Sequence, residues 1–246
     1  MDVRSLPFVD VAAAERTAAE IDAHGLEFRE VNRRIKQALA DGARDITVLN
    51  PGAKHNLGVG ILQPCRLVFE GSCGYFAAGL IDGPRVHVKG RVGWSLAENM
   101  MDGEVVVDGT AGSCTGAALR GGTIVVRGNV GARTGINQKG GDIVAGGDAG
   151  FITGFMMQKG RIVVCGDVGR ATGDSMYDGE IFVGGTIGSL GTDAVFAEVD
   201  ALDRLWLDET FERYRLDQPA RWRKIVAGRK LYNYDKLEPA ERKIAL

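Results

Sequence analysis

The stretch that decides the fold is GEVVVDGTAGSCTGAALRGGTIVVRGNVGARTGINQKGGDIVAGG, residues 103–147. Within it, the strand-like runs EVVVD, TIVVR and DIVAG follow one another at a spacing of nineteen residues. Working outward, RLVFE and RVHVK come before this stretch, and RIVVC and EIFVG come after it in the same register. A fixed period of this length indicates an architecture built from stacked repeats.

Glycine is the compositional anomaly of the chain, and it belongs to the repeat. Of the 36 glycines, 30 lie between positions 71 and 191. The repeat glycines, each nineteen residues from the next, are Gly71, Gly90, Gly109, Gly128, Gly147, Gly166 and Gly185. Another glycine follows each of them three residues later. We expect these glycines at bends that require a positive φ or a close approach of two backbones.

Nineteen residues are too few for two packed helices, but they suit one rung of a parallel β-solenoid whose rungs stack at ~4.8 Å. The sequence therefore predicts an all-β fold, a right-handed parallel β-helix of about seven rungs. The predicted division is a helical cap over residues 1–45, a glycine-rich β-helix over 46–200, and an aromatic-rich, irregular or helical tail over 201–246.

The strand positions predict what lies inside the solenoid. The first and third positions of each strand, such as Val105 and Val107, should point inward because side chains alternate along a strand. The middle position should point outward, yet it is apolar in almost every rung: Val68, Val106, Val125, Val144, Val163 and Phe182, interrupted by His87. An exposed apolar row of this length is a liability, so we expect a terminal segment or a partner chain to cover it.

The flanking segments predict caps and an anchor. Helices are expected over residues 11–24 and 28–39, each followed by a glycine, and a strand over 46–49. The tail carries the aromatic residues Trp206, Trp222 and Tyr232. If the amino-terminal helices cover the apolar row, these aromatics become candidate anchors on a partner.

Charge argues against several classes of partner. There are 30 Lys and Arg against 32 Asp and Glu, a formal net charge of -2, so nothing draws the whole chain toward nucleic acid or an anionic membrane. No uncharged run approaches the length of a transmembrane helix, and the start of the chain lacks the apolar core of a signal peptide. We expect a cytoplasmic protein whose four cysteines are reduced thiols.

The sequence predicts no catalytic, cofactor-binding or metal-binding residues in this chain. The three histidines fall in separate elements, and no glycine-rich string has the form of a dinucleotide or phosphate loop. The strongest catalytic candidates are Asp148 and Asp167, which occupy the same ladder position in neighbouring rungs. Asx-type turns explain that position without a ligand.

A set of polar residues forms a further candidate surface on one arch of the rungs. It comprises Arg120, Arg133, Lys139, Gln158 and Lys159. Three interpretations stay open for it: an anion site, a partner interface, or a solvated rim. Arg133, Lys139 and Lys159 are the residues we single out as candidate partner contacts.

Beyond the register, the segments NPGAKHNLGVG, GWSLAENMMDG, GARTGINQKGG, GFITGFMMQKG and GDSMYDGEIFVGG carry a resemblance. Over about residues 28–200, the chain resembles the GXGXG β-helix domain at the carboxyl end of glutamate synthase large subunits. It is most similar to the free-standing, GlxC-like members of that family, which belong to complexes of the N-methylglutamate synthase type.

The resemblance implies a non-catalytic scaffold in a hetero-oligomer. The implied partners are a class II glutamine-amidotransferase-like subunit and a glutamate-synthase-like subunit that carries FMN and iron-sulfur clusters. Two alternatives remain. One is the β-helix subunit of a formylmethanofuran dehydrogenase or formyltransferase/hydrolase complex, which has a similar fold. The other is a stand-alone β-helix enzyme acting on polysaccharide through Asp148 and Asp167.

Overall fold

The computed structural model describes residues 17–228, and its helices are α1 (Phe28–Ala40) and α2 (Ala201–Tyr214). The strands are β1 (Ala18–Asp22), β2 (Asp45–Leu49), β3 (Arg66–Glu70), β4 (Asp82–Val88), β5 (Asp102–Val107), β6 (Thr123–Val126), β7 (Lys139–Ala145), β8 (Lys159–Val164), β9 (Glu180–Val183), β10 (Ala194–Ala197) and β11 (Arg223–Ala227).

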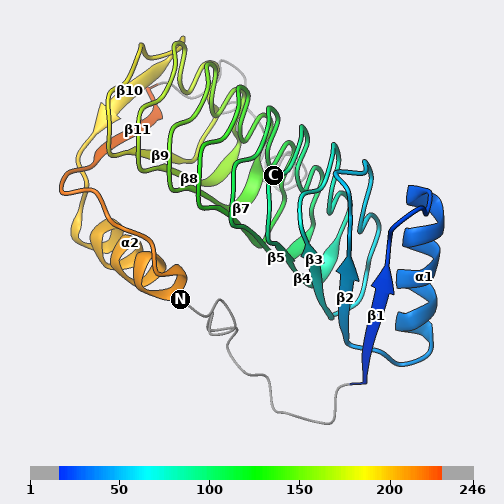
Figure 1. The fold of residues 1–246 in the computed structure, drawn as a ribbon. Coiled ribbons are helices and arrows are strands. Elements are labelled where there is room, and N and C mark those ends of the chain that lie inside the picture. Colours follow the sequence, from blue (N-terminus) through cyan, green and yellow to red (C-terminus); the bar gives the residue numbers. More distant parts are fainter. Residues whose placement is uncertain (1–16, 229–246) are drawn as a thin grey trace, which may run out of the picture.

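The strands form one sheet that runs along the length of a solenoid (Figure 1). From β1 to β9 each strand pairs in parallel with the next, and the pairs Glu104 to Thr123 and Thr123 to Asp142 show the nineteen-residue register directly. This confirms the predicted parallel β-solenoid of about seven turns. Neither described helix is long and apolar enough to cross a membrane.

Ladders of buried side chains fill the interior. The first and third strand positions point inward as predicted, and pairs such as Val105 and Val107 are fully buried. Four residues after each of the strands β4 and β5, an isolated bridge joins Val92 to Ala111, one rung to the next. Complete burial of an aliphatic side chain stabilises the fold by roughly 1.5–3 kcal/mol, so these repeating columns supply the core.

The repeat glycines serve close backbone contact rather than positive φ. In the series that begins at Gly71, only Gly71 itself has a left-handed φ, +143°. A Cβ atom on Gly128 would lie 2.9 Å from the carbonyl oxygen of Gly109 in the previous rung. Positive φ values fall instead on other glycines of the unit, such as Gly122 at +76° just before β6 and Gly141 at +67° within β7, and on Gly116 at +66° and Gly135 at +68° between strands. The predicted bends exist, but these other glycines make them.

The amino-terminal end differs in part from the prediction. The helix expected over residues 28–39 is confirmed as α1, which buries Val31, Ile35 and Leu39 against the first rungs. The helix expected over residues 11–24 is wrong where it can be compared, because Ala18–Asp22 is the strand β1. Pairing of β1 with β2 outweighs the high helical propensity of Ala and Glu, because tertiary contacts override the propensity of a short segment. Residues 11–16 lie outside the described part.

The carboxyl-terminal end of the sheet was not predicted. After the last parallel strand, β11 pairs antiparallel with β9, and β10 pairs antiparallel with β11. The order β9-β11-β10 places β10 at the end of the sheet. The tail over residues 201–246 was predicted to be irregular or helical, but it also contributes the strand β11 to the sheet.

Candidate interaction surfaces

The outward apolar row is covered by the chain's own helix α2. A second apolar cluster joins this row to the helix. It contains Val106, Val125, Val144, Val163 and Phe182 from β5 to β9, and Leu207, Phe211 and Tyr214 from α2. The expectation that a terminal segment covers the row is thereby confirmed for these five strands. The covering segment belongs to the tail and not to the amino-terminal helices.

The dimensions of α2 match the row that it covers. A helix of 14 residues is about 21 Å long, and five strands spaced at ~4.8 Å span about 19 Å from first to last. Figure 1 shows α2 lying beside the carboxyl-terminal half of the solenoid. The helix therefore runs along the solenoid axis, from β9 at its first turn to β5 at its last turn.

An ionic contact holds the last turn of α2 at β5. The Tyr214 hydroxyl donates a hydrogen bond of 2.5 Å to Glu104, and Arg213 donates another of 3.0 Å to the same carboxylate. Burial, that hydrogen bond and the negative charge of Glu104 all raise the pKa of Tyr214 above its usual range. The phenol therefore remains protonated as the donor at neutral pH.

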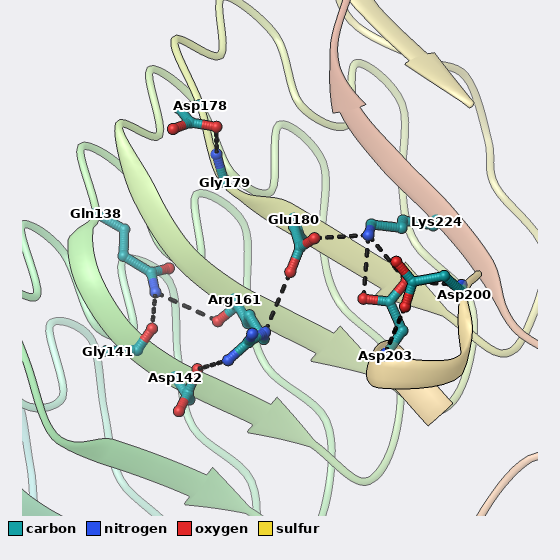
Figure 2. Close-up of polar contacts among 10 residues, drawn as sticks. All are labelled: Gln138, Gly141, Asp142, Arg161, Asp178, Gly179, Glu180, Asp200, Asp203 and Lys224. Carbon is teal, nitrogen blue, oxygen red and sulfur yellow. Dashed lines mark hydrogen bonds and ion pairs between the residues drawn. The ribbon is translucent and has the colours of Figure 1, made fainter. Parts of the chain in front are cut away.

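A second ionic network holds the first turn of α2 at β9 (Figure 2). Lys224 of β11 is buried and contacts Asp203 at 2.8 Å and Glu180 at 2.6 Å. Burial lowers the pKa of Lys224, but its bonds to Asp203 and Glu180 raise the pKa by more than burial lowers it, so the net shift is upward. Asp203 also forms a capping box with Asp200 at the start of α2.

The same network continues onto β8. Arg161 donates to Glu180 at 3.1 Å and approaches Asp142 at 3.9 Å, so it lies between two carboxylates in Figure 2. Its guanidinium also lies 4.5 Å from the centre of the Trp206 ring. Burial raises the pKa of Asp142, and the charge of Arg161 opposes this shift. These charges fix α2 and β11 to the solenoid and need no ligand.

Two of the three aromatic anchors predicted in the tail are used within the chain. Trp206 packs against Phe182, with ring centroids 6.4 Å apart, and Trp222 packs against Phe211 at 5.6 Å. Both belong to the partly buried rim of the cluster under α2. Both side chains therefore complete the internal cover, a role that the prediction of partner contacts did not include. Tyr232 lies outside the described residues.

A different set of aromatics remains exposed on the first rungs. His55, Tyr75 and Trp94 stack face to face, with centroid separations of 4.5 Å and 5.5 Å. Tyr75 is 49% exposed and Trp94 is 57% exposed. We call these three residues the aromatic ladder. Each ring lies over the glycine of the following rung, and a Cβ on Gly112 would meet Trp94 at 2.5 Å.

Sequence reasoning missed the aromatic ladder, although a signal was available. Tyr75 and Trp94 each directly follow the second glycine of a repeat unit, so the register alone places them one above the other. Phe151 occupies the same position further along and is 50% exposed. The Arg133 guanidinium lies 5.2 Å from the centre of the Phe151 ring. This contact places Arg133, a predicted partner contact, beside an exposed aromatic side chain.

The other predicted cations line one corner of three successive rungs. Lys139 and Lys159 are register partners in β7 and β8, and Arg120 precedes them by one rung, where its N–H bonds the carbonyl oxygen of Met100. Within residues 17–228 no carboxylate forms an ion pair with any of the three. Like charges directly opposite in a sheet are destabilising, so this basic row favours an external negative group.

The paired aspartates Asp148 and Asp167 are brought together, but for a structural purpose. The Asp148 carboxylate accepts the backbone N–H of Asp167 at 2.8 Å, and the Asp167 carboxylate accepts the N–H of Thr186 at 2.6 Å. Asn129 accepts the N–H of Asp148 in the same way. The predicted local Asx turns are thus replaced by bonds from one rung to the next.

One threonine in each of four successive rungs and His87 are likewise bonded within the fold. The buried side chains of Thr115, Thr134, Thr153 and Thr172 each donate to the carbonyl oxygen three residues earlier, as Thr134 does to Gly131 at 2.9 Å. His87 is buried and lies 3.0 Å from Asp108. Burial raises the pKa of Asp108, but the bond to His87 and the charge of Arg127 lower it more, so the net shift is downward.

The cysteines are free thiols. Burial raises the pKa of Cys73 to about 12 and that of Cys65 to about 11, so both are protonated at neutral pH. The described residues contain no cluster of three or more His, Cys, Asp or Glu side chains that could hold a metal ion.

One buried polar side chain stands out within the core. Gln138 replaces an aliphatic residue in its column and is fully buried. Its Nε2 donates to the carbonyl oxygens of Gly140 and Gly141 at 3.1 Å and 2.9 Å. Its Oε1 has no hydrogen-bond partner. Gln138 therefore fixes the backbone of Gly140 and Gly141 beside Lys139, while its own acceptor atom, Oε1, stays unsatisfied.

Comparison with known proteins leaves the family of this chain undetermined. No family model matches the chain, and no curated protein is significantly similar to it. The resemblance to GXGXG proteins rests on the glycine register and on the segments that share it.

Proposed function

We propose that this chain is a non-catalytic scaffold subunit of a glutamate-synthase-like complex, most closely the GXGXG β-helix subunit of N-methylglutamate synthase (methylamine-glutamate N-methyltransferase). Its partners would be a class II glutamine-amidotransferase-like subunit and an FMN-dependent, iron-sulfur subunit. The complex would convert methylamine and glutamate into N-methylglutamate and ammonia. In this proposal the chemistry belongs to the partners, and this chain supplies a rigid surface that fixes them relative to one another.

The observation that carries the scaffold role is the aromatic ladder. Large side chains exposed in a row on a stiff element are the usual anchors of protein interfaces. The rings of Tyr75 and Trp94 are held by stacking, so little conformational freedom is lost when a partner covers them. Arg133, Lys139 and Lys159 add a basic region further along the solenoid. The outward apolar row of β5 to β9 offers no comparable surface, because α2 covers it.

The proposal is tested by co-purification. The chain is expressed from its own gene cluster with an affinity tag, and we expect an amidotransferase-like chain and a yellow flavoprotein to be recovered with it. Trp94→Ala should lower that recovery severely, and so should the double variant Lys139→Glu, Lys159→Glu.

Matched controls are available on surfaces outside the proposed interface. Leu202→Ala removes an apolar side chain that is 77% exposed on α2, and Arg221→Glu reverses an exposed cation in the segment before β11. Both should leave recovery unchanged. A wild-type chain that is purified alone from its source cells, or a Trp94→Ala chain that retains both partners, would contradict the proposal.

A further inference from the structure

The carboxyl-terminal end of the sheet presents an edge strand without the usual protection. β10 pairs with β11 on one side, and none of the described residues pairs with its other side. Natural edge strands are commonly protected by charged residues, proline, a bulge or a covering element. The four residues of β10 are Ala-Val-Phe-Ala, and Val195 is 43% exposed and Phe196 55% exposed.

The opposite end of the sheet shows how this chain protects an edge. β1 also pairs on one side alone within the described residues. It carries the exposed acids Glu20 and Asp22, and α1 packs beside it. The apolar character of β10 is therefore specific to one end of the solenoid.

The hydrogen-bond alternation identifies the groups that β10 presents. The N–H of Gly228 donates to the carbonyl oxygen of Asp193 at 2.6 Å, and the register continues with Val195 opposite Val226. In an antiparallel ladder, hydrogen-bonded and non-hydrogen-bonded pairs alternate. The N–H and C=O of Phe196 consequently point to the free edge, where a further strand would bond them.

The surroundings of β10 indicate the chemistry of that strand. The exposed acids Asp193 and Glu198 lie at the two ends of β10. A cleft of about 540 Å³ adjoins it, lined by Phe196, Ala197, Glu198, Val199, Arg204, Trp222, Arg223 and Lys224. The cations of this cleft are Arg204 of α2 and Arg223 and Lys224 of β11, the strand on the side of β10 away from its free edge.

A second copy of this chain is a poor occupant of the edge. Residues 192–200 hold Asp193, Glu198 and Asp200 and no Lys or Arg, so two β10 strands side by side would bring only negative charges to the shared edge. Like charges brought together at an interface disfavour the pairing.

We propose that the free edge of β10 binds an extended segment of a partner polypeptide by β-strand addition, and that this segment is apolar at its centre and basic at its ends. Backbone bonds at Phe196 supply affinity, while the acids at both ends of β10 select the charge. The inference rests on the proposed scaffold function, since it names the kind of segment that a partner subunit contributes.

The test uses the purified full chain and two fluorescein-labelled peptides, Lys-Val-Thr-Val-Thr-Val-Lys and Glu-Val-Thr-Val-Thr-Val-Glu, with anisotropy as the measurement. The basic peptide should bind more tightly than the acidic one. Phe196→Pro removes the N–H at an edge position that tolerates proline, and should weaken binding about tenfold. Phe196→Leu keeps that N–H and should retain binding. Glu198→Lys should reduce or reverse the preference between the peptides.

Each contrary result overturns the proposal. These results are no binding of the basic peptide to the full chain, equal binding of both peptides, or binding that is unchanged in both Phe196→Pro and Glu198→Lys. The peptide assay contains no other subunit, so it is independent of the co-purification experiment. A negative peptide assay would overturn the strand-addition proposal alone, and a negative co-purification would overturn the scaffold proposal alone.

Discussion

At the scale of single residues, the repeat glycines show what a sequence pattern can and cannot say. The nineteen-residue spacing locates them without a structure, but it does not distinguish a need for positive φ from a need for space. Gly131 illustrates the second case. A Cβ there would meet the backbone nitrogen of Ser113 at 2.4 Å and the carbonyl carbon of Gly112 at 2.6 Å. Backbone atoms of a packed rung cannot move aside as the end of a side chain can.

Gly131→Val should therefore destabilise the protein by more than about 3 kcal/mol, at the upper end of single-residue effects. Asp148→Ala removes one exposed acceptor for a backbone N–H and should cost about 1 kcal/mol. Urea unfolding followed by circular dichroism measures both. If Asp148→Ala proves the more damaging variant, the aspartates have a role beyond the bonds between rungs.

At the scale of elements, the need for a cover could be predicted, but its identity could not. The apolar middle positions of the strands predict that something packs on them, because period-2 alternation places them outside the core. The sequence of α2 does not reveal which surface it packs on, because the contact is not purely apolar. Besides the apolar row, the helix contacts the charged residues Glu104 and Lys224. The strands β1 and β11 were missed because pairing partners far along the chain determine them.

Phe211 should be the principal apolar contact of α2, because it is 3% exposed and lies in the cluster over the row. Phe211→Ala should destabilise the protein by about 3–5 kcal/mol. Leu202→Ala, on the exposed side of the same helix, should change the stability by less than about 0.5 kcal/mol. Equal melting temperatures for the two variants would show that α2 does not contribute to the core.

The contact of Tyr214 with Glu104 predicts sensitivity to alkaline pH. The pKa of Tyr214 is raised in the folded chain, whereas an unfolded tyrosine titrates near about 10. Its contribution is fully present below about pH 10 and is lost as the pH rises further, because the unfolded chain releases the proton first. Unfolding free energies between about pH 9 and 11 should fall more steeply for the wild type than for Tyr214→Phe. Parallel curves would contradict this assignment.

At the scale of the whole molecule, the periodic part could be predicted from the sequence and the ends could not. Each rung repeats the same pattern, so seven registers support one another, whereas β10, β11 and α2 occur once. The candidate surfaces divide in the same way. The positions of Arg133, Lys139 and Lys159 follow from the repeat register. The covering role of Trp206 and Trp222 depends on the single helix α2 and could not be predicted from the repeat.

The proposed scaffold role has a direct biochemical consequence. The isolated chain should be colourless and should show no turnover with glutamine, glutamate or methylamine, because the proposed flavin and nucleophile belong to other subunits. An absorption spectrum and a glutaminase assay on the purified chain measure this. Bound flavin, or glutaminase activity that survives removal of every other chain, would contradict it.

The length of α2 also bears on how the solenoid opens. Rungs of a solenoid contact their neighbours alone, so each can fray with little effect on distant ones. Because α2 lies across β5 to β9, none of those five strands can detach without first losing the helix, and they should open as one cooperative unit. In native-state hydrogen exchange, their amides should share a single opening free energy, above that of β2 to β4, and Phe211→Ala should lower it for all five together.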